Sequence, residues 1–146
     1  MKKELDDQLC KEFPKLFGER DLPMNETAMC WGFSHGDGWY NVIHALCSNI
    51  QRHIDWKNRE SEVVKQVVVK QVKEKFGTLR FYYEGGDEYI SGLVSMAETM
   101  SAHTCEQCGS PGKRIGGGWV RTLCAKHTEE AEEERAKYMK ADGLEE

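Results

Sequence analysis

The chain has 146 residues, a formal net charge of -5 at pH 7, and 39% hydrophobic and 10% aromatic residues. This length suits one compact domain with a small appended module, and the apolar content can build a core, which excludes wholesale disorder. No apolar run approaches the roughly 20 residues that cross a bilayer, and no apolar segment follows the lysines of MKKELDDQLC. We therefore expect a cytoplasmic protein with no secretory signal and no membrane partner.

The cysteines and the charges are distributed unevenly. In a reducing cytosol the six cysteines are expected to be thiols or metal ligands rather than disulfides. Residues 128–146 contain eight acidic and three basic residues, whereas residues 65–80 contain five basic residues and one acidic residue. The acidic total argues against a general nucleic-acid coat protein, but the basic stretch is compatible with a local anion site.

Two patterns occupy the N-terminal part of the chain. Apolar residues recur near helical spacing over residues 5–17, which predicts a short amphipathic helix that Pro14 ends or bends. Residues 22–35 show no sustained period, so we expect a loop or a short extended piece there.

The strongest helix is predicted over residues 37–56. Seven apolar residues form a single stripe along it, and Asp37 or Gly38 occupies the position of an N-cap. Trp39 and Cys47 belong to this stripe, so core packing is the plain interpretation of both.

Residues 62–84 change to an alternating pattern rich in β-branched residues, which predicts a β-hairpin that turns at Gly77. One register gathers the apolar side chains on one face, whereas a slip by one residue would mix the two faces. The predicted register pairs Glu74 with Leu79, Val72 with Phe81 and Lys70 with Tyr83.

This register places two like charges, Lys73 and Arg80, directly opposite each other. Such pairs destabilise a sheet, so we expect a compensating anion: a neighbouring carboxylate, the acidic C-terminal segment or a ligand. The turn HGDGWY ahead of the long helix could add backbone N–H groups and a helix N-terminus to an anion site. The predicted ligand-binding residues are Lys73, Lys75, Arg80, Tyr82, Asp37 and Trp39.

Two further helices are predicted in the C-terminal half. Residues 87–103 return to helical spacing, with Asp87 as the expected cap. Residues 128–140 contain good helix formers but only a thin apolar stripe, so this acidic helix is expected to be solvated.

A CxxC pair and a CxxH pair are separated by 15 residues. Each short pair can reach one metal ion from a single turn, and a hairpin-length insert can bring the pairs together, as in a treble-clef zinc finger. Four protein ligands close a tetrahedral site, so the Zn²⁺ is predicted to be structural rather than catalytic. A redox CxxC is the main alternative, but the βαβ context that such a motif needs is absent. The predicted ligands are Cys105, Cys108, Cys124 and His127.

Two other functions stay open at this point. His35, Asp37 or His44 could serve a hydrolase or nuclease, although no signature spacing supports a catalytic site. A nucleic-acid-binding or host-protein-binding module could instead act through the zinc finger. Its predicted contacts are Lys113, Arg114, Trp119 and Arg121.

Three blocks of the sequence occur together: GDGWYNVIHALCSNI, VKEKFGTLRFYY and TCEQCGSPG…GWVRTLCAKH. In this order they resemble a widespread set of small zinc-finger-containing proteins of tailed bacteriophages and prophages. The resemblance covers residues 30–127 and implies a cytoplasmic location in an infected host cell. By analogy with other small phage proteins, it implies binding of host factors, among them nucleotide signals of host defence.

Together these patterns predict an α+β fold in which helices pack on a β-hairpin. We divide the chain into a core domain over 1–103, a zinc-binding hairpin module over 104–128 and an acidic helix or tail over 129–146. The favoured function is non-enzymatic capture of an anionic ligand such as a nucleotide, and whether the protein forms a homo-oligomer stays open.

Overall fold

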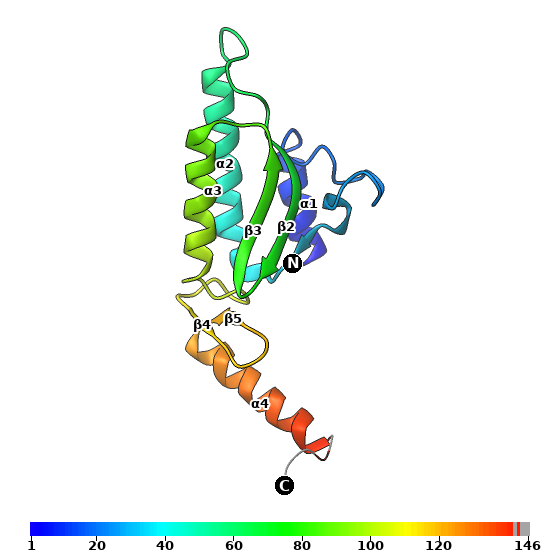
Figure 1. The fold of residues 1–146 in the computed structure, drawn as a ribbon, viewed down its shortest axis with the longest axis vertical. Helices are drawn as coiled ribbons and strands as arrows, with labels where there is room; N and C mark the ends of the chain where they lie inside the picture. The colour runs from blue at the N-terminus through cyan, green and yellow to red at the C-terminus, as the bar shows by residue number, and fades with distance from the viewer. Residues whose placement is uncertain (142, 144–146) are drawn as a thin grey trace.

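The main sheet has three strands in the order β1–β2–β3 (Figure 1). The structure is a computed structural model that describes residues 1–141 and 143. The predicted hairpin is formed by β2 (Val68–Lys75) and β3 (Thr78–Glu84), and β1 (Phe33–Ser34) pairs with β2 in parallel. A parallel neighbour needs a crossover connection, which the long helix between β1 and β2 supplies. The predicted α+β fold class is confirmed.

The register of the hairpin agrees with the prediction except at one pair. The predicted pairing of Lys70 with Tyr83 is wrong, because a β-bulge between Val69 and Gln71 sets Val69 opposite Tyr83. The extra residue of the bulge frees Lys70 to form an ion pair with Glu19 at 2.7 Å, and it turns Val69 into the core. The pairs that lie as predicted are Val72–Phe81, Lys73–Arg80 and Glu74–Leu79.

The hairpin turns at Phe76 and Gly77, which both have positive φ angles, 53° and 81°. Two central residues of this kind form a type I′ turn, whose twist matches that of the flanking strands. Gly77 adopts this conformation without a steric penalty, whereas Phe76 is a bulky residue in a region that glycine and asparagine prefer.

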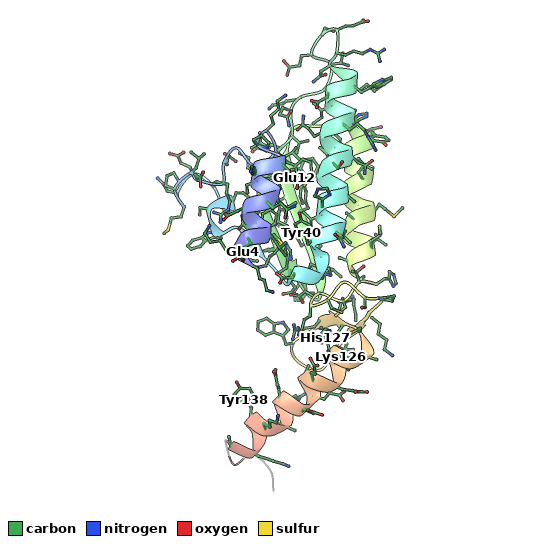
Figure 2. The ribbon with its side chains drawn as sticks, turned by 180° about the vertical axis from the view of Figure 1, so that it is seen from behind. Glu4, Glu12, Tyr40, Lys126, His127 and Tyr138 are labelled. Atoms are coloured by element: carbon green, nitrogen blue, oxygen red, sulfur yellow. The ribbon has the colours of Figure 1, made fainter. Side chains whose placement is uncertain are left out.

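Three helices cover one face of the sheet and the outer edge of β3. They are α1 (Lys3–Glu12), α2 (Tyr40–Lys57) and α3 (Glu88–Ser101). The strands lie in front of α1 in Figure 1 and behind α1 and α2 in Figure 2, which is seen from the opposite side. In the described part of the chain the other face of the sheet carries no helix.

The helices differ from their predicted bounds at their ends. α1 stops at Glu12, two residues before Pro14, and the chain continues in turns as far as residue 22. A single 3₁₀ turn, η2 (Asp37–Trp39), precedes α2, so neither Asp37 nor Gly38 is its N-cap, and no side chain caps it. A second such turn, η1 (Met29–Trp31), leads into β1.

α3 closes the free edge of the sheet. Its N-cap is Asp87, as predicted, and the Asp87 carboxylate accepts a 3.1 Å hydrogen bond from the Ile90 N–H. Backbone N–H groups on the outer edge of β3 donate to side chains of α3: that of Phe81 to Glu98 at 3.0 Å and that of Leu79 to the Ser101 hydroxyl at 2.9 Å. This edge therefore offers fewer donors to a foreign strand.

One hydrophobic core fills the space between the helices and the sheet. Its buried members come from every element of the larger part of the chain, so residues 1–103 pack as one unit. The largest fully buried side chains in this core are Trp39, Leu9, Leu16, Met29, Ile43, Ile50, Leu79 and Ile90.

A smaller part follows α3 and carries the cysteine cluster. It consists of a hairpin of β4 (Lys113–Ile115) and β5 (Arg121–Leu123) and a final helix, α4 (Ala125–Ala141), which extends away from the rest of the molecule (Figure 1). α4 begins three residues earlier than predicted, which places His127 in its first turn, and none of its described residues is buried. No helix in the described residues is long and apolar enough to cross a membrane.

Candidate metal centre and basic sheet face

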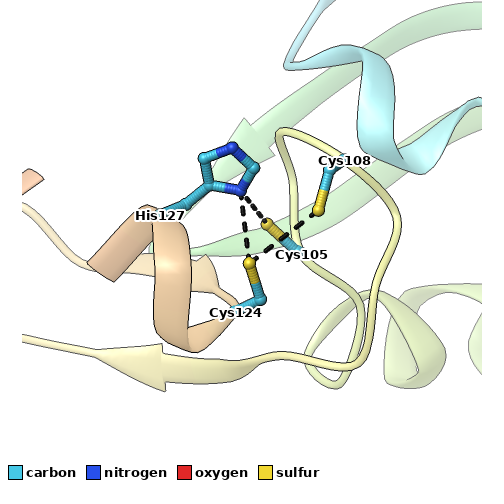
Figure 3. Close-up of side chains that lie close together, drawn as sticks. All are labelled: Cys105, Cys108, Cys124 and His127. Atoms are coloured by element: carbon cyan, nitrogen blue, oxygen red, sulfur yellow. Dashed lines mark hydrogen bonds between the residues drawn. The ribbon is translucent and has the colours of Figure 1, made fainter. Parts of the chain in front are cut away.

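The three cysteines and the histidine of the sequence motif converge on one point. The ligand atoms of Cys105, Cys108, Cys124 and His127 all lie within 4.8 Å of one another, and Figure 3 shows the four side chains pointing toward a common centre. The His127 Nδ1 atom lies 3.2 Å from the Cys124 sulfur and 3.4 Å from the Cys105 sulfur, and the Cys108 and Cys124 sulfurs are 3.8 Å apart. A tetrahedron with metal–sulfur bonds of about 2.3 Å has sulfur–sulfur edges of about 3.8 Å. The geometry therefore fits one four-coordinate metal ion.

Local backbone structure positions each pair of ligands. Cys105 and Cys108 flank a tight turn in which the Gly109 N–H donates a 2.9 Å hydrogen bond to the Cys105 carbonyl, with Gly109 at a φ of 79°. Cys124 immediately precedes α4, so the helical rise brings His127 onto the same side of the first turn.

The electrostatics of the cluster favour a thiolate. Hydrogen bonds from Ser110, led by its side chain, lower the pKa of the Cys108 thiol to about 6. Burial acts in the other direction on Cys105 and raises the pKa of its thiol. Metal ligation requires the deprotonated thiol, so Cys108 is the ligand best prepared for it.

The metal hairpin, defined as residues 104–124, is fastened to the tip of the β2–β3 hairpin. The Thr122 hydroxyl donates a 2.5 Å hydrogen bond to the Gly77 carbonyl, and the Arg114 guanidinium donates to the Phe76 carbonyl at 2.8 Å. Both carbonyls of the turn are thus held by the metal hairpin. Arg114 and Phe76 lie 38 positions apart in the chain, and Thr122 and Gly77 lie 45 positions apart.

The turn that precedes α2 docks on the metal hairpin, and its Gly36 N–H already donates a 3.1 Å hydrogen bond to the Glu106 carboxylate. Trp39 is 0% exposed, and its indole N–H donates to the Thr104 carbonyl at 2.9 Å. The predicted role of Trp39 in ligand contact is therefore wrong, and its interpretation as a core residue is correct. Asp37 accepts a 2.7 Å hydrogen bond from the Lys2 N–H and lies 3.7 Å from the Lys2 amine, so its carboxylate already has partners.

The predicted basic side chains gather on the uncovered face of the sheet, which we call the basic sheet face and define by Lys73, Lys75, Arg80 and Tyr82. Lys73 lies directly opposite Arg80, and its amine lies 5.9 Å from the centre of the Tyr82 ring. The Arg80 Nη1 atom donates to Thr78 Oγ1 at 2.6 Å, which holds the guanidinium along β3.

No carboxylate in the described residues forms an ion pair with Lys73, Lys75 or Arg80. The acidic helix was one of the compensating anions expected from the sequence. Its described residues do not neutralise this face, because their ion pairs stay within α4. The like charges on this face remain uncompensated within residues 1–141 and 143.

The residues considered for hydrolysis do not form a catalytic group. Burial lowers the pKa of His35 to about 4, and its Nδ1 atom lies 2.7 Å from the Gly36 carbonyl. His44 instead pairs with Glu12 of α1 at 2.7 Å. Neither histidine shares a hydrogen bond with Asp37 in the described structure.

The four contacts predicted for a zinc-finger interface divide into two kinds. Arg114 donates a hydrogen bond to the Phe76 carbonyl, and Arg121 forms a long ion pair of 3.9 Å with Glu106, so both face groups of the protein. Trp119 and Lys113 are exposed, and Trp119 is 79% exposed.

Sequence reasoning missed a groove beside Trp119. It has a volume of about 830 Å³ and lies between the metal hairpin, α4 and the end of the main sheet. The only signal in the sequence was an aromatic residue after three glycines and a tyrosine in an acidic helix, and neither pattern reveals that the two residues share one hollow.

The chain matches no protein-family model, no curated protein and no solved structure. The geometry of the metal centre, the basic sheet face and the groove is therefore the basis for the function proposed below.

Proposed function

We propose that this protein is a non-catalytic binding protein that captures a phosphate-bearing ligand on its basic sheet face, with a structural Zn²⁺ holding the hairpin tip in place. One observation carries the proposal: Lys73 lies directly opposite Arg80, and neither pairs with a carboxylate in the described residues. Such a pair weakens a sheet unless an anion binds to it. A ligand phosphate is the anion that a guanidinium and an ammonium bind best together.

Zn²⁺ is the metal that this ligand set favours. Three thiolates and one imidazole in tetrahedral arrangement match structural zinc sites, and four protein ligands leave no position for substrate. The segment that the ion closes is rich in glycine and contributes few side chains to the core, so metal binding supplies the folding free energy that apolar burial does not.

The shape of the basic sheet face favours an extended ligand over a compact one. Lys73 and Lys75 are two residues apart on β2, so both side chains lie on the same face and their Cα atoms are about 7 Å apart along the strand. Neither of the two cavities described is lined by a residue of this face. Small-molecule sites are usually concave, whereas single-stranded nucleic acid binds to open basic surfaces with aromatic stacking platforms. Tyr82, which is 42% exposed, is the aromatic residue placed for stacking.

The test measures binding of fluorescent single-stranded DNA and RNA, of mononucleotides and of signalling dinucleotides at two salt concentrations. We expect the oligonucleotide to bind most tightly, with binding that weakens as salt rises. Arg80→Ala is expected to weaken binding about tenfold or more, because it removes charge-assisted hydrogen bonds. Lys11→Ala is the matched control, since Lys11 is an exposed lysine of α1.

The arms of this experiment separate the possible sources of the phosphate. Tight binding of a dinucleotide alone would identify a nucleotide signal, as the resemblance to phage proteins implies. Absence of binding by every phosphate ligand at low salt, or an equal loss in Lys11→Ala and Arg80→Ala, would overturn the proposal.

A further inference from the structure

The groove beside the metal hairpin has an aromatic rim. Trp119 follows the loop Gly116–Gly118 and is 79% exposed, and Tyr138 projects from α4 with 73% of its surface exposed (Figure 2). Both residues line the same hollow of about 830 Å³. Large aromatic side chains left in water on two sides of one groove mark a surface that a partner covers.

The groove is also acidic. Four glutamates and two arginines line it, so the lining carries two net negative charges. The charged residues of the lining are Glu74, Glu106, Glu132, Glu134, Arg121 and Arg135. Phosphate ligands are therefore repelled from this hollow, in contrast to the basic sheet face.

The deepest carboxylate of the groove is only loosely neutralised. The Glu106 side chain is 11% exposed, and one of its oxygens accepts a 3.1 Å hydrogen bond from the Gly36 N–H. Its nearest cation, the Arg121 Nε atom, lies 3.9 Å away, beyond hydrogen-bond distance. A cation that came closer to the Glu106 carboxylate would lower the energetic cost of burying its charge.

α4 lacks the packing that normally stabilises a helix of its length. Its 17 residues include none that is buried, although isolated helices of about this length are marginal in water. Of the five α4 residues that line the groove, Ala131, Arg135 and Tyr138 recur at i, i+4 and i+7 and so form one face. An occupant of the groove would bury this face and stabilise α4.

We infer that the groove binds an extended, lysine- or arginine-rich segment of a partner protein. A cationic side chain of that segment lies against the Trp119 and Tyr138 rings, and its charge is met by the glutamates of the groove. Aromatic faces attract guanidinium and ammonium groups, and adjacent carboxylates add a charge-assisted hydrogen bond. Charge complementarity therefore selects a basic partner. This site is separate from the basic sheet face and does not depend on what that face binds.

The test uses labelled peptides of alternating arginine and glycine, with glutamate–glycine peptides of equal length as the negative probe, and fluorescence anisotropy on the zinc-loaded full chain. We expect the arginine peptide to bind and the glutamate peptide not to bind. Trp119→Ala is expected to weaken binding about tenfold, whereas Arg80→Ala on the basic sheet face should leave it unchanged.

Two neighbouring glutamates provide the matched control. Glu132 lines the groove, whereas Glu133 is exposed and is not part of its lining. Glu132→Gln is expected to weaken peptide binding severalfold, and Glu133→Gln should have little effect. Circular dichroism and metal content verify that each variant keeps its fold. Trp119, Glu132 and Glu133 are exposed, and Arg80 is half-buried.

Three results would overturn the inference. One is equal weakening by Glu132→Gln and Glu133→Gln, which would indicate diffuse attraction to an acidic helix. Another is absence of arginine-peptide binding at low salt. The third is concentration-dependent self-association that Trp119→Ala abolishes while peptides fail to compete, which would identify a second copy of this chain as the occupant.

Discussion

The Thr122 hydroxyl donates a 2.5 Å hydrogen bond to the Gly77 carbonyl, and this contact ties the metal hairpin to the turn between β2 and β3. Thr122 is fully buried, and the Gly77 backbone lies against the Val120 side chain and the Arg121 backbone. The metal centre and the basic sheet face are therefore mechanically linked, because the strands that carry Lys73 and Arg80 end at this turn.

Replacement of the Thr122 hydroxyl tests that link. Thr122→Val keeps the shape of the side chain but leaves the Gly77 carbonyl without its donor, so we expect a loss of about 1–3 kcal/mol in the free energy of unfolding. Denaturant unfolding measures the loss, and faster amide exchange at the hairpin turn localises it. Thr99→Val, at an exposed position of α3, is the control and should cost much less. Unchanged exchange at the turn would contradict the proposed coupling.

Metal removal is expected to unfold the metal hairpin before the rest of the protein. Chelation, or Cys124→Ser, removes the free energy of ligation from a segment that has little apolar burial. Residues 1–103 have their own core and should keep their secondary structure. Elemental analysis is expected to find one zinc per chain in the parent protein. Amide exchange that rises equally in α2 and in the metal hairpin would show that the two parts do not unfold separately.

A buried hydroxyl of α3 holds one of the two bonded N–H groups on the edge of β3. Ser101 is fully buried and accepts a 2.9 Å hydrogen bond from the Leu79 N–H. Ser101→Ala leaves this N–H without a partner, so the free energy of unfolding should fall by about 1–3 kcal/mol. Ser95→Ala, in an exposed position of the same helix, serves as the control and should be close to neutral.

The positive φ of Phe76 provides an opportunity to stabilise the hairpin. Asparagine tolerates this conformation better than phenylalanine, and the Phe76 ring is 65% exposed, so Phe76→Asn should raise the free energy of unfolding by up to about 1 kcal/mol. Phe76→Ala also removes the ring but lacks the short polar side chain whose local hydrogen bond favours positive φ in asparagine, so it should give no such gain. Thermal unfolding of the two variants side by side measures the difference, and equal melting temperatures would refute the explanation.

His35 makes stability depend on pH. Burial lowers the pKa of His35 to about 4 in the folded state, compared with an ordinary value of about 6.5. Between these values the unfolded chain binds a proton that the folded chain does not, so this contribution is fully present above pH 6.5 and is lost as the pH falls toward 4. From pH 7 to pH 5.5 the loss is about 1 kcal/mol.

His35→Gln separates this effect from other titrations. The variant cannot take up the proton, so its free energy of unfolding should change less between pH 7 and pH 5.5 than that of the parent protein. Metal content is measured at both values, because protonation of the ligands also weakens the metal hairpin. Identical pH profiles in the two proteins would rule out His35 as the source.

Local patterns determined much of this protein. The helical stripe over 37–56, the alternation over 62–84 and the spacing of the cysteine and histidine pairs each depend on neighbours within one element or motif. Periodicity and ligand spacing act over these short distances, so they predicted the long helix, the register that opposes Lys73 to Arg80, and the four residues that converge as metal ligands.

Only the tertiary structure decided the remaining features, because they arise between segments that are distant in the chain. Trp39 is buried beneath Thr104, 65 residues away, and a bulge lets Lys70 reach Glu19, 51 residues away. The groove exists because a metal-closed hairpin and an extended helix meet at an angle that no local pattern encodes. Long-range packing also pairs Asp37 with Lys2, 35 residues away, whereas Lys73 and Arg80 lie opposite each other without an ion pair in the described residues.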